Sequence, residues 1–379
     1  MLSNSQIEEA RSLFPHTKNG MIYFNHASTG PMSKPVIEAL NEYIKLRSEE
    51  KIDDYKKLLK LTRESKILLG GLINSEPDRI AFTQNTSAGI NIIAQGIHWK
   101  KGDEILLNNI EFPANVYPFL NLKDYGVNVK FIEADNGIVT ADDLINAITP
   151  STKLISVSYV QFLSGYRIEL EKLGKVCREK GIILSVDAIQ GIGALSIDVK
   201  KCNIDFISCG TQKWLLGLQG MGFIYVNEDL QNKMKTIPVG WLSVENAWDF
   251  TTYDFNLKKT ANRFQGGTLN AAGIYALHSA LGVFNRYGFN EIEETVLNNT
   301  NYFINQLSSA GFEPILKNLP EKNLAGIVSI KSEKGAHILD SLVKNNIIAA
   351  VREDVVRFSP HFYNTKQEID KVVAELKNY

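Results

Sequence analysis

The segment SCGTQKWLLGLQGMGFIYV, residues 208–226, places one lysine between two apolar stretches. Lys213 follows the apolar run IDFISC (204–209) and is followed directly by Trp214 and two leucines. The next apolar run, GFIYV (222–226), returns after a glycine-rich loop that is too short for a helical crossover, so we expect antiparallel pairing. A lysine in such apolar surroundings is expected to be desolvated and to have a lowered pKa, which is how nucleophilic lysines are produced.

The chain before this segment alternates short apolar runs with helical patterns. Such βα repetition predicts a mostly parallel seven-stranded sheet with helices on both faces. The expected strands are residues 79–83, 103–109, 129–134, 153–160, 182–188, 204–209 and 222–226, and helices are expected to open at Thr86-Ser87, near Pro113, at Thr140 and within 168–181.

The pattern changes after about residue 265. Two helical stretches, 269–286 and 291–308, are followed by short apolar runs and by a final helix that begins at 366. We therefore expect a large α/β domain of residues 21–265 and a smaller α+β domain made of residues 1–20 and 266–379. One long helical stretch, 33–69, is expected before the first strand, with Ser33 as its cap.

Composition excludes several classes of protein. The 379 residues are 44% hydrophobic and 22% charged, with a net charge of −1, so no basic excess favours nucleic acid or an acidic membrane surface. No apolar run approaches the ~20 residues of a membrane helix, and the N-terminus lacks the apolar segment of a signal peptide. The three cysteines, Cys177, Cys202 and Cys209, suggest no disulfide framework. We expect a cytoplasmic protein without a metal site.

Polar residues follow the carboxyl ends of the expected strands, where open α/β sheets bind ligands. Asp187 closes an apolar strand, and a buried carboxylate needs a partner. Thr86 and Ser87 are equally consistent with a helix cap, and Phe112 with a core position. The full set is Asn85, Thr86, Ser87, Glu111, Phe112, Pro113, Asn115, Gln161, Ser164, Arg167, Asp187, Gln190, Thr211, Gln212 and Lys213.

This set suits one cofactor, pyridoxal 5′-phosphate (PLP). PLP needs a lysine for its Schiff base, a carboxylate that keeps its pyridine nitrogen protonated, a flat apolar group over its ring and a helix N-terminus for its phosphate. A dehydrogenase or a serine hydrolase is not favoured, because the chain has neither a G-x-G-x-x-G nor a G-x-S-x-G pattern.

At these residues the chain resembles the class V aminotransferase group of fold-type I PLP enzymes, which includes cysteine desulfurases, isopenicillin-N epimerase and kynureninase. The resemblance runs from YFNHASTGP (23–31) to VVRFSPHFYNTKQEID (355–370). In SVDAIQGIGAL (185–195) it implies that Asp187 pairs with the pyridine nitrogen and that Gln190 bonds the ring 3′-oxygen. In GTQKWLLG (210–217) it makes Lys213 the Schiff-base lysine, with Phe112 stacked over the ring.

The resemblance also implies phosphate and substrate contacts. TQNTSAGIN (83–91) resembles the phosphate-binding turn at Thr86 and Ser87, to which Thr211 or Gln212 adds a contact. RFQGGTLN (263–270) resembles the segment that enters the neighbouring subunit's site with Thr268, which implies a homodimer with a shared active site. VRFSPHFYNT (356–365) supplies Arg357, whose guanidinium suits the substrate α-carboxylate.

The N-terminal stretch FNHASTG (24–30) resembles the active-site loop of the epimerase group. It implies that Asn25 and His26 contact the substrate, with His26 a candidate for proton transfer, and a purely structural histidine is an equal alternative. Arg167 either orients the site or holds a loop.

Two departures separate the chain from the desulfurase pattern. Phe112 stands where desulfurases have a histidine, and phenylalanine neither donates a hydrogen bond nor moves a proton. The stretch NNIIAAVREDVVRFSP (345–360) has no cysteine, although desulfurases carry a nucleophilic cysteine there. Sulfur transfer to the enzyme is therefore not expected, and we place the chain nearer to the epimerase and kynureninase side.

We therefore expect an enzyme that acts at the Cα or β-position of an amino acid through an external aldimine, with Lys213 as general base or acid. A class V aminotransferase reaction is the leading hypothesis, and an epimerase or a C–S or C–C lyase is the alternative. A catalytically silent PLP-fold sensor or scaffold is the non-enzyme alternative, but it would be expected to lose Lys213, Asp187 or Arg357.

Overall fold

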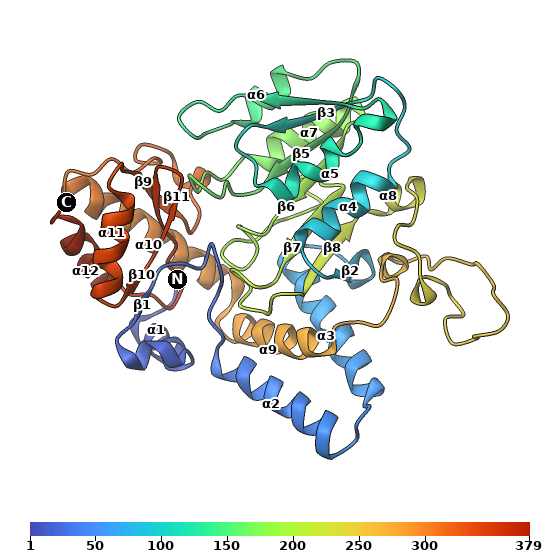
Figure 1. The fold of residues 1–379 in the computed structure, drawn as a ribbon, viewed down its shortest axis with the longest axis horizontal. Coiled ribbons are helices and arrows are strands. Elements are labelled where there is room, and N and C mark those ends of the chain that lie inside the picture. The colour runs from blue at the N-terminus through green and yellow to red at the C-terminus, as the bar shows by residue number, and fades with distance from the viewer.

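The computed structural model describes residues 1–379, and a seven-stranded sheet forms its centre (Figure 1). Five neighbouring strands of this sheet run parallel, as the βα repetition predicts. The strand order is β2 (Ile80–Thr83), β8 (Gly222–Val226), β7 (Phe206–Gly210), β6 (Ile183–Asp187), β5 (Thr152–Ser158), β3 (Glu104–Asn108) and β4 (Asn128–Ile132).

Strand β8 is antiparallel to both of its neighbours, β7 and β2. Gly210 at the end of β7 faces Gly222 at the start of β8 across the sheet, and no helix lies in the loop between them. A loop this short reverses the chain instead of crossing over the sheet. The prediction of a mostly parallel seven-stranded sheet with one antiparallel return is confirmed.

Alternation along the strands separates two apolar cores, one on each face of the sheet. In β7, Phe206 belongs to one core and Ile207 to the other, and in β5 Leu154 and Ile155 divide in the same way. Helices cover both faces because each face presents such a row of apolar side chains. These helices are α4 (Thr86–Gly96), α5 (Tyr117–Leu120), α6 (Ala141–Asn146), α7 (Leu170–Lys180), α8 (Glu228–Lys233), α3 (Tyr55–Ile73) and α9 (Ala271–Tyr287).

The long helical stretch expected over 33–69 is two helices, and this part of the prediction is wrong. Helix α2 (Lys34–Glu49) ends before a turn in which Ile52 has a φ of 60°. Helix α3 starts anew because the Asp54 carboxylate accepts a hydrogen bond from the backbone N–H of Lys57, which satisfies one free donor of its first turn. Ser33 occupies the N-cap position of α2, but its side chain makes no capping bond.

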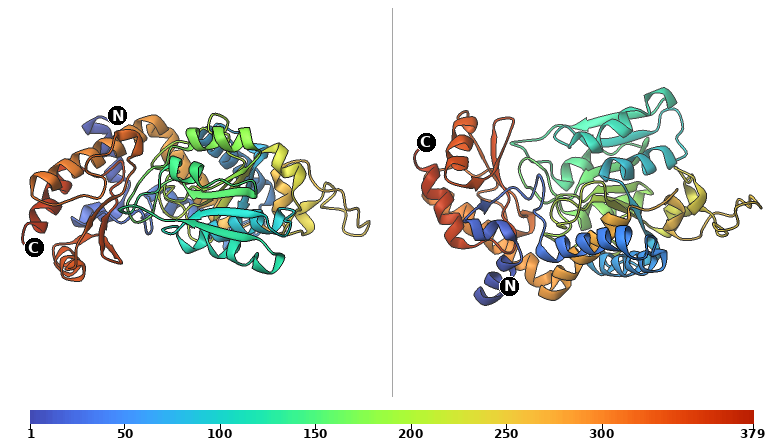
Figure 2. Two further views of the ribbon diagram at one scale, coloured as in Figure 1. Left: turned by 90° about the horizontal axis from the view of Figure 1, so that it is seen from above. Right: turned by 60° about the horizontal axis from the view of Figure 1, so that its bottom comes forward.

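A second, smaller group of elements lies at one end of the molecule (Figure 2). Its antiparallel sheet has the order β11 (Ala350–Arg352), β12 (Val355–Phe358) and β9 (Val328–Lys331). The N-terminal strand β1 (Ile22–Tyr23) pairs with β10 (Ile347–Ile348), so a segment near the start of the sequence lies beside one near its end. The helices of this group are α1 (Asn4–Ser12), α10 (Phe289–Ser309), α11 (Gly335–Lys344) and α12 (Lys366–Leu376).

Helix α9 follows the expected domain boundary at residue 266 but lies beside α2 and α3 under the main sheet (Figure 1). The division of the chain into two domains at this residue stays a prediction. None of the helices combines the length and the apolar character that crossing a bilayer requires.

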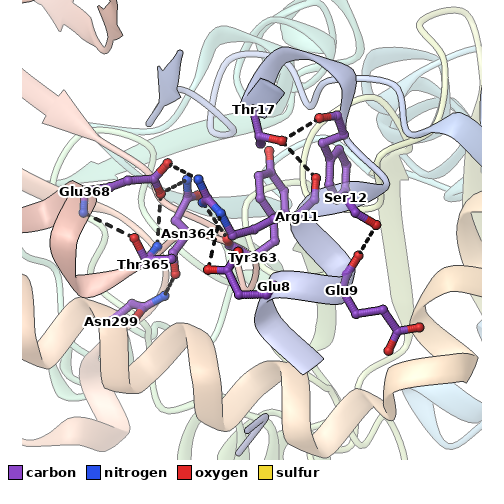
Figure 3. A network of polar contacts seen from close by, with 11 residues as sticks. Glu8, Glu9, Arg11, Ser12, Thr17, Asn299, Tyr363, Asn364, Thr365 and Glu368 are labelled. Atoms are coloured by element: carbon purple, nitrogen blue, oxygen red, sulfur yellow. Dashed lines mark hydrogen bonds and ion pairs between the residues drawn. The ribbon is translucent and has the colours of Figure 1, made fainter. Parts of the chain in front are cut away.

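A polar network fastens α1 to the segment that leads into α12 (Figure 3). Arg11 forms an ion pair with Glu368 at 2.9 Å and donates a hydrogen bond to the Tyr363 carbonyl at 3.0 Å. Glu368 also accepts from the Asn364 side chain and from the backbone of Thr365, each at 3.0 Å. The side chains of Arg11 and Glu368 are only 17% and 8% exposed, so the pair is largely withdrawn from water.

We expect Arg11→Met to lower the free energy of unfolding by about 3 kcal/mol, because it leaves the buried Glu368 carboxylate without its cation. Chemical denaturation measures this loss. Arg286→Met is the matched control, since it breaks the exposed pair between Arg286 and Glu9 of α1 and is expected to cost less than about 1 kcal/mol. Equal decreases in the free energy of unfolding of the two variants would show that the buried pair of Arg11 stabilises the protein no more than the exposed pair of Arg286.

Candidate active site

Lys213 and Asp187 lie at the carboxyl edge of neighbouring strands. Asp187 ends β6 and is 2% exposed, and Lys213 lies in the loop that leaves β7. The Lys213 Nζ atom is 5.6 Å from the ring centroid of Phe112. Phe112 is 45% exposed, so the alternative in which it is a core residue is wrong. The three side chains that the sequence predicts around a PLP ring are thus brought to one edge of the sheet.

Burial dominates the electrostatics of this edge. Burial lowers the pKa of Lys213 to about 8, against the attraction of Asp187, and Arg357 lowers that pKa further. Burial also raises the pKa of Asp187, although the N–H of Ile189 donates to its carboxylate at 3.0 Å. A lysine with a lowered pKa is partly neutral near neutral pH, and the neutral amine is the form that attacks an aldehyde.

Arg357 is a buried cation without an anionic partner. It lies in β12, is 2% exposed, and donates from Nη1 to the Phe162 carbonyl at 2.7 Å and from Nη2 to the Ser28 hydroxyl at 2.9 Å. Its Nε atom is buried and has no partner. Burial, together with the charge of Arg352, lowers the pKa of Arg357 to about 10. A guanidinium held in this way is suited to a carboxylate brought by a ligand.

The first turn of α4 forms a cradle near the same edge. Asn85 is the N-cap and accepts from the N–H of Ala88, so the alternative in which Thr86 or Ser87 caps the helix is wrong. The Thr86 hydroxyl accepts from the N–H of Gly210 at 3.0 Å. A Cβ atom on Gly210 would lie 2.6 Å from the Gln212 Oε1 atom and 3.3 Å from the Thr86 hydroxyl oxygen. Only glycine leaves this space open, and the N-terminus of an α-helix favours a phosphate there.

Two predicted cofactor contacts use their side chains within the protein. The Thr211 hydroxyl bonds to the carbonyls of Leu218 and Met221, each at 3.0 Å, and so holds the glycine-rich loop. The Gln190 amide donates to the Ala27 carbonyl and accepts from the Trp214 ring N–H, each at 3.0 Å. Of Thr211 and Gln212, the structure places Gln212 beside Thr86, and the roles of Thr211 and Gln190 toward a cofactor stay predictions.

His26 is buried in an aromatic cluster. Its Nδ1 atom bonds to the Ser359 carbonyl at 2.8 Å and its Nε2 atom to the Tyr363 hydroxyl at 2.7 Å. Burial, and the nearby His361, lower the pKa of His26 well below its ordinary value. Both ring nitrogens are engaged, so this geometry favours the structural alternative over proton transfer. Its neighbour Asn25 is only partly buried, and its side-chain oxygen has no partner.

Two predicted residues lie elsewhere. Thr268 is exposed and lines a cavity of about 500 Å³ with Trp241 and Tyr275, and its predicted role in a partner's site stays a prediction. Arg167 donates to the Lys322 carbonyl at 2.6 Å and forms an ion pair with Glu293 at 3.4 Å. These contacts agree with a residue that holds a loop.

Two further residues support the site: Glu111, which lies after strand β3 as the sequence predicts, and Ser28, which sequence reasoning missed. Glu111 is 7% exposed and accepts from the Ser158 backbone at 2.9 Å and from the Asn108 amide at 2.7 Å, and it adds to the raised pKa of Asp187. The Ser28 hydroxyl accepts from both Arg357 and Arg352. No local pattern could have linked Ser28 to arginines more than 300 residues away.

The chain matches the family pattern described as aminotransferase class-V over residues 22–372. It belongs to the aminotransferase class-V family. It is 30% identical over 372 residues to a probable cysteine desulfurase of Methanothermobacter thermautotrophicus, covering 92% of each chain. It is 28% identical over 369 residues to the uncharacterized aminotransferase YcbU of Bacillus subtilis, covering 97% of each.

Among solved structures, the apo cysteine desulfurase of Thermococcus onnurineus NA1 has a TM-score of 0.88 and 26% identity, with 98% of this chain and 97% of that chain covered. The family confirms the predictions of a class V enzyme of fold-type I and of PLP as its cofactor. Two of these three relatives are named desulfurases, and none of the three is named an epimerase or a kynureninase.

The residues present fit PLP. A partly buried amine follows β7 and a buried carboxylate ends the neighbouring strand β6. An exposed aromatic ring lies over the amine, and the space beside Gly210 opens onto the first turn of a helix. These are the four chemical requirements of the cofactor.

We expect the rate constant for the reaction of PLP with cofactor-free protein to rise as the pH rises through about 8, because the amine of Lys213 loses its proton over that range. An ordinary lysine would give the same rise near a pH of about 10.4. Stopped-flow measurement of the visible absorbance of the lysine-bound cofactor follows the reaction.

Lys213→Ala is expected to abolish both this absorbance and turnover. Lys66→Ala is the control, because Lys66 is a second buried lysine whose pKa burial lowers to about 7, and it lies on α3 against Phe82 and Asn262. Visible absorbance and turnover that survive in Lys213→Ala would overturn the assignment of Lys213.

Proposed function

We propose that this chain is a PLP-dependent lyase that breaks the C–S bond of a cysteine-type amino acid and releases the sulfur with the product. The observation that carries the proposal is a site equipped with a lysine, a carboxylate and an arginine but with no reactive thiol. The desulfurase names of the relatives from Methanothermobacter thermautotrophicus and Thermococcus onnurineus support a reaction at the C–S bond of cysteine.

All three thiols are poorly suited to accept sulfur. Burial raises the pKa of Cys177 to about 12 and of Cys202 to about 11, and it raises the pKa of Cys209 well above its ordinary value. Each thiol therefore stays protonated at neutral pH, and the thiolate is the nucleophilic form. Sulfur that leaves the substrate must then depart in the product instead of binding to the protein.

Each residue of the site has a part in holding the reactants. Asp187 would hold the protonated pyridine nitrogen of PLP, Phe112 would cover its ring, and Thr86, Ser87 and Gln212 would hold its phosphate. Bound PLP supplies an acceptor for the electron pair that remains at Cα when a proton leaves it. Arg357 would bind the substrate α-carboxylate through two parallel hydrogen bonds.

Lys213 is the group placed to move the proton. Once the substrate amine has displaced it, the Lys213 Nζ atom would take the proton from Cα, and its lowered pKa makes it a base near neutral pH. Phe112 lies over the amine where a histidine could have protonated a departing sulfur. Without an acid at position 112, we expect the site to favour sulfur that leaves as a weakly basic anion.

The expected substrates are therefore disulfides such as L-cystine, whose departing persulfide is less basic than the hydrosulfide or alkylthiolate that leaves cysteine or a thioether. Elimination from L-cystine consumes one water and yields pyruvate, ammonia and a cysteine persulfide. Transamination is the second candidate, favoured by the family and by the relative named an aminotransferase. Transamination would give a keto acid that retains its sulfur, and it would release no ammonia.

We also propose a homodimer that completes the site. Thr268 is exposed and lines a cavity to which Lys213 does not belong. The nearby loop over residues 241–255 projects from the body, and its Tyr253 is 88% exposed (Figure 2). An exposed aromatic loop of this kind is suited to a protein interface. Analytical ultracentrifugation tests the proposal, which a monomer at micromolar concentration would contradict.

We expect pyruvate and ammonia to appear from L-cystine in equal amounts, with turnover faster than on L-cysteine or S-methylcysteine. Enzymatic assays of both products make the measurement. Keto-acid formation without ammonia would instead establish transamination, and no reaction with any sulfur amino acid would contradict both candidates.

Phe112→His tests whether the site lacks an acid that could protonate the departing sulfur. The variant is expected to raise the rate on S-methylcysteine relative to L-cystine, because a histidine protonates a basic leaving group. Phe112→Leu is the matched control, since it removes the aromatic ring without adding an acid, and it is expected to slow both substrates alike. A rate ratio that histidine leaves unchanged would show that protonation of the departing sulfur does not limit the reaction.

A further inference from the structure

A second arginine reaches the hydroxyl that Arg357 contacts. Arg352 ends β11, which pairs antiparallel with β12, the strand that carries Arg357. The Nη2 atom of Arg352 donates to the Ser28 hydroxyl oxygen at 3.2 Å, and the Nη2 atom of Arg357 donates to the same oxygen at 2.9 Å. Two guanidinium groups from neighbouring strands thus meet at one oxygen of the N-terminal loop.

Neither guanidinium is neutralised by the protein. No ion pair of the chain includes Arg352 or Arg357, although Glu353 and Asp354 follow Arg352 directly in the hairpin. The charge of Arg352 lowers the pKa of both Arg357 and Lys213. Two like charges held together without a counter-ion repel each other, so the arrangement favours a ligand that brings negative charge.

Unused hydrogen-bond donors near the two arginines also favour an anionic ligand. The Ser28 oxygen accepts from both arginines, so its own O–H remains available to donate. The Arg357 Nε atom is buried and unpartnered. A carboxylate that forms two parallel hydrogen bonds occupies one guanidinium group. The Ser28 hydroxyl and the second guanidinium group therefore remain available after one α-carboxylate has bound.

The two arginines differ in depth. Arg357 is 2% exposed and lies within the protein. Arg352 is exposed at the rim. An amino acid whose α-carboxylate lies on Arg357 would therefore extend its side chain and leaving group past Arg352 toward solvent.

We propose that Arg352 binds a second anionic group of the substrate, carried by the leaving group, while Arg357 binds the α-carboxylate. The substrate class is then an amino acid with an anion on the far side of its C–S bond, such as the second carboxylate of L-cystine or the sulfonate of S-sulfocysteine. The C–S bond in this statement rests on the proposed function, whereas the preference for two anionic groups does not.

Calorimetric titration of the PLP-loaded protein with unreactive acids tests the preference by itself. We expect glutarate, which has two carboxylates, to bind about 10-fold or more tightly than butyrate, which has one, because the second carboxylate adds a charge-assisted hydrogen bond to Arg352. Arg352→Gln is expected to remove this difference without changing the affinity for butyrate. Arg178→Gln, at an exposed arginine of α7, is the control that changes neither affinity.

Steady-state kinetics test the same residue in the reaction. Arg352→Gln is expected to lower kcat/KM for L-cystine by about 10- to 100-fold and to affect kcat/KM for S-methylcysteine much less, because that substrate carries no second anion. Arg352→Lys keeps the charge but loses the planar guanidinium. Its kcat/KM for L-cystine is expected to lie between those of the unmodified protein and Arg352→Gln.

The proposal is overturned if Arg352→Gln weakens both acids alike, or if glutarate binds no more tightly than butyrate. Absence of lyase activity combined with retained selectivity for glutarate would refute the proposed function and leave the second anion site in place.

Discussion

A largely desolvated amine and a buried carboxylate attract each other at the carboxyl edge of the sheet, and the surrounding structure is organised around this pair. Taking Lys213 and Asp187 out of water is unfavourable, and their mutual attraction offsets only part of that cost. The pairing of β6 with β7 up to Asp187 and Ser208 fixes Asp187 and the strand from which the loop of Lys213 leaves. The desolvation that lowers the stability of the fold also lowers the pKa of Lys213. The amine is therefore partly in its neutral, nucleophilic form.

Three distant parts of the chain hold this pair in place. Gly30 of the N-terminal loop donates to the Gln212 carbonyl at 2.7 Å, and a Cβ atom there would lie 2.3 Å from the Lys213 carbonyl oxygen, so only glycine permits the contact. His26 links the same loop to Ser359 and Tyr363. The network of Arg11 and Glu368 then secures the C-terminal segment that carries these residues (Figure 3).

The predictable parts of the molecule are those that leave a local signal. Alternating apolar runs located every strand of the main sheet, and the short loop after Lys213 predicted the antiparallel return of β8. Lys213 and Asp187 are predicted because charged residues in apolar runs are conspicuous, whereas Arg357 is predicted only by the family resemblance of its segment. The break between α2 and α3 was missed because a polar stretch around Asp54 looks the same inside an exposed helix and at a cap.

The roles of Gln190, Thr211 and Ser28 could not be predicted, because they depend on which hydrogen bonds the fold uses. The desulfurase names of two relatives likewise differ from the expected epimerase and kynureninase side. Overall similarity is set by the many residues of the scaffold, whereas that expectation rested on Phe112 and on the cysteine-free stretch before Arg357.

Borohydride reduction of the PLP-loaded protein, followed by peptide mass spectrometry, is the sharpest test of the role of Lys213. Reduction fixes the cofactor permanently to the amine that holds it. We predict a single modified peptide with the added mass on Lys213. Modification of another lysine, such as the buried Lys66, with Lys213 left unlabelled would contradict this prediction.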